Sequence, residues 1–437
     1  MTGLVLRRTA WWLVVVAAIP LGVIGALTAL AATASLSGSR WAAVVAALGV
    51  SVCTGHVVRP AVRRIAETRS WRRGLTGGVS VLTTAIVTAS TGSLLLAPAP
   101  PYSPAEPTAE TRFWDLPTGS RLAYTHTAAT GERRPTPVIL VHGGPGAPAS
   151  RQDSLTRALA DVGFDVYDYH QVGAGLSERL PDVREYTVAR HVADLDGIRE
   201  ILDADRLVLV GASWGGTLIA HYLAAHPHRV ARAVIDSPGE IWPPAFPDRG
   251  RLTEAGQRNQ QEVLGRYPRF LLAAVLAGTV GPRTAHTLLP DSQMDGVFEA
   301  FVSELDMRPG CSPAAAAADD PADRDSPAAD SAERPRGLGF WANVATTMDA
   351  AQVADPRPAL QLATAPVLVL RAECDYLSWE ATREYRDVLP VATLLAVDDA
   401  GHTVTTSRPD VHRRLVRAFL LGEPLPQPAY TDADPPW

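Results

Sequence analysis

The 437-residue sequence contains no lysine, because all 40 basic residues are arginine, and its net charge is −6. The first 97 residues carry nine arginines against one glutamate, a balance of +8 that leaves −14 for the remaining chain. A strongly acidic remainder argues against a nucleic-acid surface on the larger part of the protein. We therefore expect no nucleic-acid partner.

Cysteine is scarce, with three residues in the whole chain. Cys53 lies in an apolar run, and the sequence leaves open whether Cys311 and Cys374 pair. No cluster with metal-ligand spacing and no phosphate-binding loop stands out. We therefore expect a protein that works without a metal ion or cofactor.

Charge is absent from long stretches of the N-terminal region. No charged residue occurs from Thr9 to Ser39, and two further apolar runs occupy 41–58 and 74–97. About 20 apolar residues cross the hydrocarbon core of a bilayer. The sequence thus predicts three transmembrane helices, at about 9–36, 41–58 and 74–97. The alternative is one cleaved signal peptide followed by soluble core helices, but the first run is longer than a usual signal segment.

Arginine placement predicts the orientation of these helices. Arg7 and Arg8 precede the first run, and Arg40 alone separates the first two. The connection before the third run is the most basic part of the chain and holds Arg59, Arg63, Arg64, Arg69, Arg72 and Arg73. Positive loops stay in the cytoplasm. We therefore expect a multi-pass protein of the cell membrane with a cytoplasmic N-terminus and an extracytoplasmic chain after residue 98.

A proline-rich stretch at 98–110 is expected to form an extended linker to a folded domain. Beyond it, short apolar runs alternate with helical patterns. Strands are expected in a hairpin over 112–128 and at 137–141, 164–170, 206–212, 232–237, 366–372 and 392–400, and helices at 150–162, 187–202, 216–226 and 409–421. This alternation predicts an α/β fold with a mostly parallel sheet covered by helices on both faces. Its core should comprise 111–240 and 360–422, followed by a tail at 423–437.

The segment "GASWGG" places Ser213 where a predicted strand turns directly into a helix. Gly211, Gly215 and Gly216 surround it in the pattern G-x-S-x-G, which is typical of a nucleophile elbow. Such a turn raises the serine hydroxyl above the strand ends and points a helix N-terminus at the reacting centre. Ser213 is therefore the expected nucleophile, although a plain glycine-rich turn is the simpler alternative.

A serine nucleophile needs a base and an orienting acid, and in this arrangement they follow in the order acid, then histidine. Asp375 follows one predicted strand and His402 follows the next. We expect them to complete a catalytic triad with Ser213. Glu373 and Asp236 also follow strands and compete for the role of the acid.

The segment "HGGPG" at 142–146 follows the predicted strand at 137–141. A glycine-rich loop there can bring a backbone N–H close to a tetrahedral oxyanion. We expect the N–H groups of Gly144 and Trp214 to form the oxyanion hole, with Gly143 as the alternative to Gly144.

Together, "VHGGPG", "GASWGG" and "AGHT" resemble the α/β-hydrolase fold, and the first two resemble in particular the prolyl iminopeptidase family of serine exopeptidases. The stretch "YDYHQVGAGLSER" is similar to another segment of that family, with departures at Tyr169, His170 and Val172. The resemblance implies a serine hydrolase that releases N-terminal residues through an acyl-enzyme. It also implies an inserted helical lid at 241–359, with helical stretches near 252–278 and 293–306 and at 340–352. Within this lid, 312–336 contains no aromatic or branched apolar residue and is expected to be a disordered insert.

In prolyl iminopeptidases, lid carboxylates hold the free amine of the substrate. Glu304, Glu299 and Asp306 are the acids available for this role here, although a solvated helix face explains them equally well. The expected substrate is a peptide or a small ester. An extracellular carboxylesterase and a non-catalytic sensor or binding module are the alternatives, and the sequence does not indicate the oligomeric state.

Overall fold

The computed structural model describes residues 2–65, 69–96, 98–148, 153–246, 252–306 and 336–437. They form two compact units. The helical unit comprises Met1–Ala99 with Pro268–Gln293, and the sheet unit comprises Pro100–Tyr267 with Met294–Trp437. The insert expected to be disordered lies outside the described residues, apart from Arg336.

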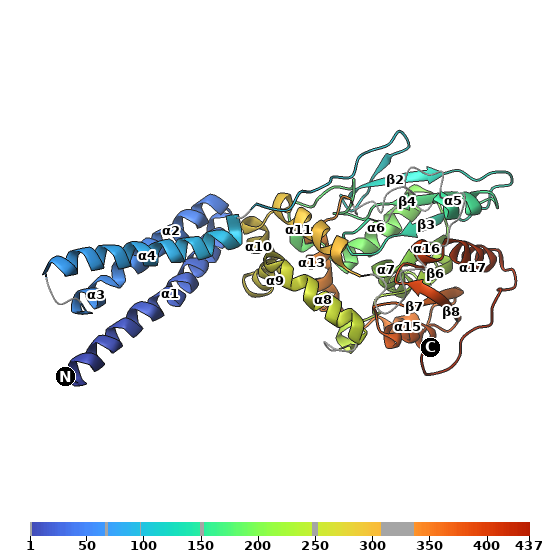
Figure 1. Cartoon of the computed structure of the whole chain (residues 1–437). Helices are drawn as coiled ribbons and strands as arrows, with labels where there is room; N and C mark the ends of the chain where they lie inside the picture. The colour runs from blue at the N-terminus through green and yellow to red at the C-terminus, as the bar shows by residue number, and fades with distance from the viewer. Residues whose placement is uncertain (1, 66–68, 97, 149–152, 247–251, 307–335) are drawn as a thin grey trace. The chain divides into compact units, whose positions relative to one another are not determined.

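The helical unit is built from six helices (Figure 1): α1 (Thr2–Ser37), α2 (Arg40–Val57), α3 (Arg59–Ile65), α4 (Arg69–Leu96), α9 (Pro268–Val280) and α10 (Pro282–Leu288). Helices α1, α2 and α4 pack against one another. The short helix α3, which the sequence pattern did not predict, packs Val62 and Ile65 into a small apolar cluster with Val15 of α1.

Two of the three predicted spans are long and apolar enough to cross a membrane, namely Thr9–Ser37 and Arg40–Ile65. In α4 only Leu75–Ser90 forms a continuous apolar stretch, which is shorter than a span requires. The arginines before Leu75 and the glycine, serine and threonine residues within the helix lower its hydropathy. The count of three spans is therefore not confirmed by length and composition among the described residues.

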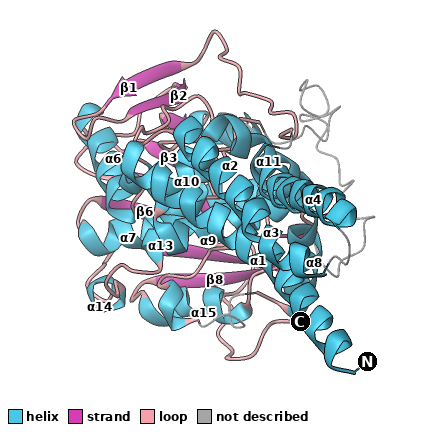
Figure 2. Cartoon of the chain, turned by 90° about the vertical axis from the view of Figure 1, so that its left-hand side faces the viewer, coloured by secondary structure: helices cyan, strands magenta, loops and turns pink. Residues whose placement is uncertain are grey.

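The sheet unit is organised around eight strands in the order β1-β2-β4-β3-β5-β6-β7-β8. Figure 2 shows strands of this sheet in magenta, with helices in front of them. The strands are β1 (Arg112–Asp115), β2 (Arg121–Thr127), β3 (Val138–Val141), β4 (Val166–Tyr169), β5 (Leu207–Ala212), β6 (Val230–Asp236), β7 (Val367–Cys374) and β8 (Ala392–Gly401). Strand β2 pairs antiparallel with β1 and β4, whereas every pair from β4 to β8 is parallel. The predicted mostly parallel sheet is confirmed, as is the hairpin at its edge.

Helices cover both faces of this sheet, as predicted. They include α5 (Asp153–Ala160), α6 (Val188–Ile201), α7 (Trp214–Ala225), α15 (Trp379–Val388), α16 (Val404–Ser407) and α17 (Pro409–Leu421). Alternate strand residues such as Val138 and Leu140 join α5 and α17 in one buried cluster. Residues of the opposite parity face α7, where Ile235 lies against Gly216. Apolar side chains on both faces explain the continuous apolar runs in the sequence.

Between β6 and β7 the chain inserts a long, mainly helical segment. Its described elements are η2 (Pro243–Ala245), α8 (Glu254–Arg266), α9, α10, α11 (Asp291–Glu304), α13 (Phe340–Ala350) and α14 (Arg357–Leu360). One helical stretch was expected near 252–278, but α8 ends at Arg266 and α9 begins at Pro268. Proline disfavours helical conformation in the residue before it, which explains the break.

The predicted linker is partly packed rather than a free tether. From Pro100 onward it belongs to the sheet unit, and the N–H of Ser103 donates to the Glu299 carboxylate at 2.9 Å. A Cβ on Gly296 would lie 2.3 Å from the carbonyl oxygen of Pro100, so only glycine allows this approach.

Candidate active site

Ser213 lies at the corner between β5 and α7, as the sequence predicted. Its backbone is strained, with φ 55° and ψ −124°, a conformation that a non-glycine residue rarely adopts. The strain is held in place by neighbours, because the Ser213 N–H donates to the carbonyl of Asp236 at 2.9 Å and its own carbonyl accepts from Gly239 at 3.1 Å.

The glycines around Ser213 are required by close packing. A Cβ on Gly215 would lie 2.1 Å from the carbonyl oxygen of Val141 on β3, and one on Gly216 would lie 2.7 Å from a methyl group of Ile235. Only residues without side chains allow α7 to start this close to the sheet. A strained serine followed by glycines in the first turn of a helix is typical of a nucleophile elbow.

Asp375 and His402 are brought together by the carboxyl ends of β7 and β8. The Nδ1 atom of His402 lies 2.7 Å from Oδ1 of Asp375, and both side chains are buried. The same carboxylate oxygen accepts the N–H of Leu377 at 3.0 Å. The ring of Tyr376 packs on the imidazole at 4.3 Å between centroids. Ser213 follows β5 at the same edge of the parallel sheet, so the three predicted residues share one edge.

The second oxygen of Asp375 is paired with Arg371, which sequence reasoning did not identify. The Arg371 guanidinium is buried, and its Nη1 lies 3.2 Å from Oδ2 of Asp375. Further donations to the carbonyls of Leu377 and Ser378 fix its orientation. The pair compensates the buried charge of the carboxylate. The one feature of the sequence that could have indicated this role is a single arginine within a predicted buried strand.

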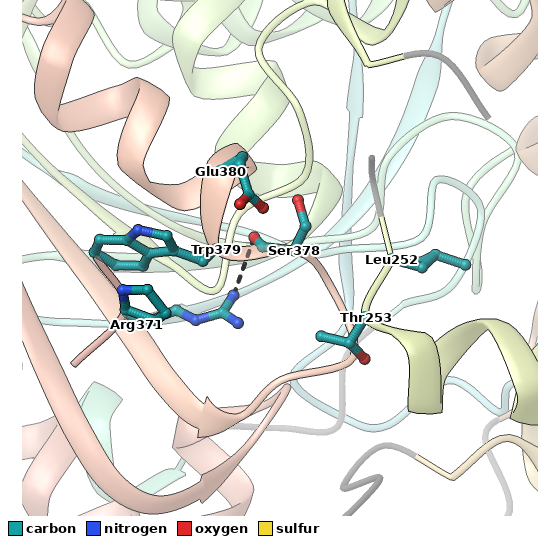
Figure 3. A pocket seen from close by; sticks show the side chains of 7 residues that line it. Leu252, Thr253, Arg371, Ser378, Trp379 and Glu380 are labelled. Carbon is teal, nitrogen blue, oxygen red and sulfur yellow. Dashed lines mark hydrogen bonds between the residues drawn. The ribbon is translucent and has the colours of Figure 1, made fainter. Parts of the chain in front are cut away.

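Arg371 also reaches a pocket of about 430 Å³ on its other side (Figure 3). The pocket is lined by Leu252, Thr253, Arg371, Ser378, Trp379, Glu380 and Pro435. Neither Ser213 nor His402 is among these residues. The pocket is therefore lined by Arg371, which pairs with Asp375, and not by the predicted nucleophile.

The two competing acids do not contact His402 in any interaction found among the described residues. Glu373 accepts the N–H of Asp399 at 2.7 Å and is exposed. Asp236 is buried, and burial raises its pKa to about 8. It lies 3.7 Å from His412, whose pKa burial lowers to about 4, so both side chains are neutral near pH 7. Asp375 is therefore the acid that the geometry favours.

The glycine-rich loop after β3 lies against Ser213. A Cβ on Gly143 would lie 3.1 Å from that of Ser213, so this glycine directly adjoins the serine. Gly144 follows with φ 111°. Either glycine therefore remains a candidate for the backbone donor that pairs with the N–H of Trp214. Both donors are predictions.

A buried hydrogen-bond network holds this loop in place. Burial lowers the pKa of His142 to about 3, so its ring is neutral. The ring accepts the Gln171 N–H at Nε2 and donates from Nδ1 to the Gly143 carbonyl. The Gln171 side chain donates to the His142 carbonyl at 2.7 Å and accepts from the Trp214 indole at 2.9 Å. Gln171 thus joins the loop to α7, a role that its position in the sequence did not indicate.

The inserted segment reaches this loop through α13. The N–H of Gly339 donates to the carbonyl of Gly146 at 2.7 Å, and the Asn343 amide donates to that of Pro145 at 2.9 Å. The N-terminal end of α13 therefore lies beside the predicted oxyanion hole.

The three acids predicted to bind a substrate amine have other contacts. Glu304 accepts hydrogen bonds from Tyr267 and Arg266, and Glu299 accepts from Ser103. Asp306 is exposed, and its N–H donates to Asn259. No contact places any of these side chains beside the triad residues in the described structure, and the same part of the chain holds no group of three or more side chains suited to a metal ion.

Comparisons with known proteins identify the family to which the fold belongs. Residues 136–405 match the family described as alpha/beta hydrolase fold. The chain is 35% identical over 121 residues to a proline iminopeptidase from Heyndrickxia coagulans, which covers 28% of this chain and 41% of that protein. A proline iminopeptidase from Neisseria gonorrhoeae is 38% identical over 101 residues, covering 23% and 31%. The chain thus spans about two fifths of the length of the first of these relatives.

Solved structures with similar folds include a proline iminopeptidase from Mycobacterium smegmatis, with 21% identity and a TM-score of 0.46 over 71% of this chain and 98% of that one. A thermophilic esterase from Thermogutta terrifontis gives 20% identity and a TM-score of 0.48 over 72% and 99%. Because the family match covers more than half of the sequence, the protein belongs to the alpha/beta hydrolase fold family and resembles proline iminopeptidases within it.

Proposed function

We propose that the protein is a membrane-anchored serine hydrolase, namely an aminopeptidase of the proline iminopeptidase type. The observation that carries the proposal is the 2.7 Å contact of His402 Nδ1 with Asp375 at the sheet edge that also presents the strained Ser213. A neutral imidazole fixed in this way exposes Nε2 as a base.

In the proposed reaction, the Ser213 hydroxyl attacks the carbonyl carbon of the substrate while its proton moves to Nε2 of His402. Negative charge develops on the carbonyl oxygen, and the N–H of Trp214 together with that of Gly144 or Gly143 stabilises it. The imidazolium then gives the proton to the leaving amine as the carbon–nitrogen bond breaks. A water molecule then attacks the acyl-enzyme while its proton moves to His402, and His402 returns a proton to Ser213 as the acyl group leaves.

Membrane attachment is supported by the two apolar helices, and an extracytoplasmic sheet unit by the arginine distribution. We therefore propose a cytoplasmic N-terminus and a substrate that meets the sheet unit outside the cell.

A carboxylesterase is the second candidate, and the lid acids favour it. Glu304 and Glu299 are already engaged by protein donors, whereas an exopeptidase needs a carboxylate for the substrate amine. An ester substrate needs no such group.

The two candidates are separated by kcat/KM for matched proline and alanine arylamides with free and acetylated amines, beside a short acyl ester. An aminopeptidase cleaves the free-amine forms better, and neutralising Glu304 by Glu304→Gln raises KM chiefly for them. Glu299→Gln and Asp306→Asn provide the same test at the other two acids. Equal rates on free and blocked amides, or turnover of the ester alone, contradict the aminopeptidase assignment. Failure of the protein to turn over any of them leaves the binding-module alternative.

A further inference from the structure

Helix α9 belongs to the helical unit although it comes from the segment inserted between β6 and β7. Its sequence, PRFLLAAVLAGTV, contains one charged residue, Arg269. Arg269 lies on the buried face of the helix with Ala273 and Ala277. The opposite face is apolar and exposed, with Leu271 at 45% and Val275 at 58% of full exposure.

This arrangement reverses the pattern of a helix on a water-soluble protein, which turns its large apolar side chains inward. Small residues at helix contacts and large apolar residues outside are typical of helices in lipid. The two candidate spans show the same reversal. Their buried positions include Ala26, Ala34, Ala43 and Ala47, and their exposed positions include Leu13, Val16, Leu21, Ile24 and Val45.

The place of α9 in the helical unit joins it to these spans. It packs against α4, and the adjoining α10 packs against α1. Arg269 lies close enough to Arg40, the first residue of α2, for the two charges to repel each other. Helix α9 therefore lies at the end of the bundle where α2 begins (Figure 1). With 13 residues it is about 20 Å long, too short to cross a hydrocarbon core of about 30 Å.

We propose that the exposed face of α9, which carries Leu271 and Val275, inserts into the bilayer beside the ends of the spans. The inference rests on the proposed membrane anchoring, and it adds a second attachment of the chain to the membrane, within the segment between β6 and β7. Lipid is the occupant because α9 belongs to the same compact unit as α1 and α2, which also expose large apolar side chains. An isolated apolar patch in water would instead indicate a protein partner.

The test uses the full chain in phosphatidylcholine nanodiscs with Cys53 replaced by serine. Nitroxide labels are attached in turn to Leu271→Cys, Val275→Cys, Val16→Cys, Ile24→Cys and Asp205→Cys. The first two report on α9, the next two on α1, and Asp205, which is 82% exposed on the sheet unit, provides the water-facing control. Power saturation measures collisions of each label with oxygen and with a water-soluble nickel chelate. Monodisperse elution shows that each variant is folded.

We expect the oxygen-to-nickel collision ratio at positions 271 and 275 to be several-fold above that at 205 and similar to that at 16 and 24. A ratio at 271 and 275 equal to that at 205, with positions 16 and 24 still in lipid, overturns this inference and leaves the anchoring intact. Water-like ratios at all positions overturn the anchoring as well. Low collision rates with both reagents at 271 and 275 mean that protein, such as a second copy of the chain, covers α9, and this also overturns the inference.

Discussion

At the scale of single residues, the candidate site depends on supports that lie far apart in sequence. Ser213, Asp375 and His402 could be predicted because each follows a strand in the order that the elbow motif requires. Gln171 and Arg371 could not be assigned roles in advance. Their partners become neighbours only when the strands are in register, and single-sequence patterns do not give side-chain contacts.

Arg371→Gln tests whether the buried pair orients Asp375. Loss of the 3.2 Å contact frees one carboxylate oxygen, and misplacement of the acid is expected to lower kcat on the order of 10²-fold. KM should change little, because Arg371 does not contact the predicted nucleophile. Arg371→Lys should recover part of kcat. A parallel rise in KM, or no recovery with lysine despite a normal melting temperature, would contradict the role of Arg371 in orienting Asp375.

Asp236→Asn tests the neutral state of the buried acid that competes with Asp375. Its folded pKa of about 8 exceeds the ordinary pKa of an aspartate, 3.8, so between these values the folded state holds a proton that the unfolded state lacks. The native protein therefore loses stability as pH rises from 5 to 8, by at most about 1.4 kcal/mol per pH unit from this group. The stability of the Asp236→Asn variant should not decrease in this way, because asparagine does not titrate.

The measurement is the melting temperature of both proteins in detergent at pH 5 and pH 8. The melting temperature of Asp236→Asn should rise relative to that of the native protein as pH rises. His412 stabilises both proteins equally as pH rises toward about 6.5, so it does not affect this difference. Glu373→Gln, on the exposed side of β7, is the control and should show no such gain. A constant difference between Asp236→Asn and the native protein would contradict the raised pKa.

At the scale of helices and strands, the sequence predicted the sheet better than the helical parts. Buried parallel strands such as β5 and β7 leave continuous apolar runs between turns, which identify them to within two residues. Helix α3 was missed because its basic sequence, RPAVRRI, looks like a loop. Its apolar face becomes evident only against Val15 of α1.

Gly215→Ala tests the close approach of α7 to β3. The new methyl group would lie 2.1 Å from the Val141 carbonyl oxygen, so the helix start must move. We expect a loss of about 1–3 kcal/mol in the free energy of unfolding, together with a severe loss of turnover. The matched control is Gly265→Ala in α8, where no atom lies within 4 Å and better helix propensity favours the variant. Equal behaviour of the two variants would contradict the packing argument.

At the scale of the whole molecule, the proposed topology depends on α4. If α1 leaves the cytoplasm and α2 returns to it, α4 must cross again to place the sheet unit outside. Its apolar stretch of Leu75–Ser90 is the shortest of the three.

Reporter fusions measure this topology directly. Fusions after Gly38 and after Glu110 should behave as exported, and a fusion at Arg69 as cytoplasmic, following the positive-inside distribution. A cytoplasmic signal from the fusion after Glu110 would show that α4 does not cross. Release of the sheet unit by cleavage after α1 would instead support a signal peptide.

The proposed function requires that Ser213, activated by His402 and Asp375, acts as the nucleophile of a hydrolase. Its most direct test is labelling of the purified full chain by a fluorophosphonate, with the modified residue located by mass spectrometry. We predict labelling of Ser213, none in Ser213→Ala, and rates reduced by about 10⁴-fold in His402→Ala and Asp375→Asn. Near-native melting temperatures should accompany these losses. Labelling at another residue, or an Asp375→Asn variant that reacts normally while Asp236→Asn does not, would contradict the account.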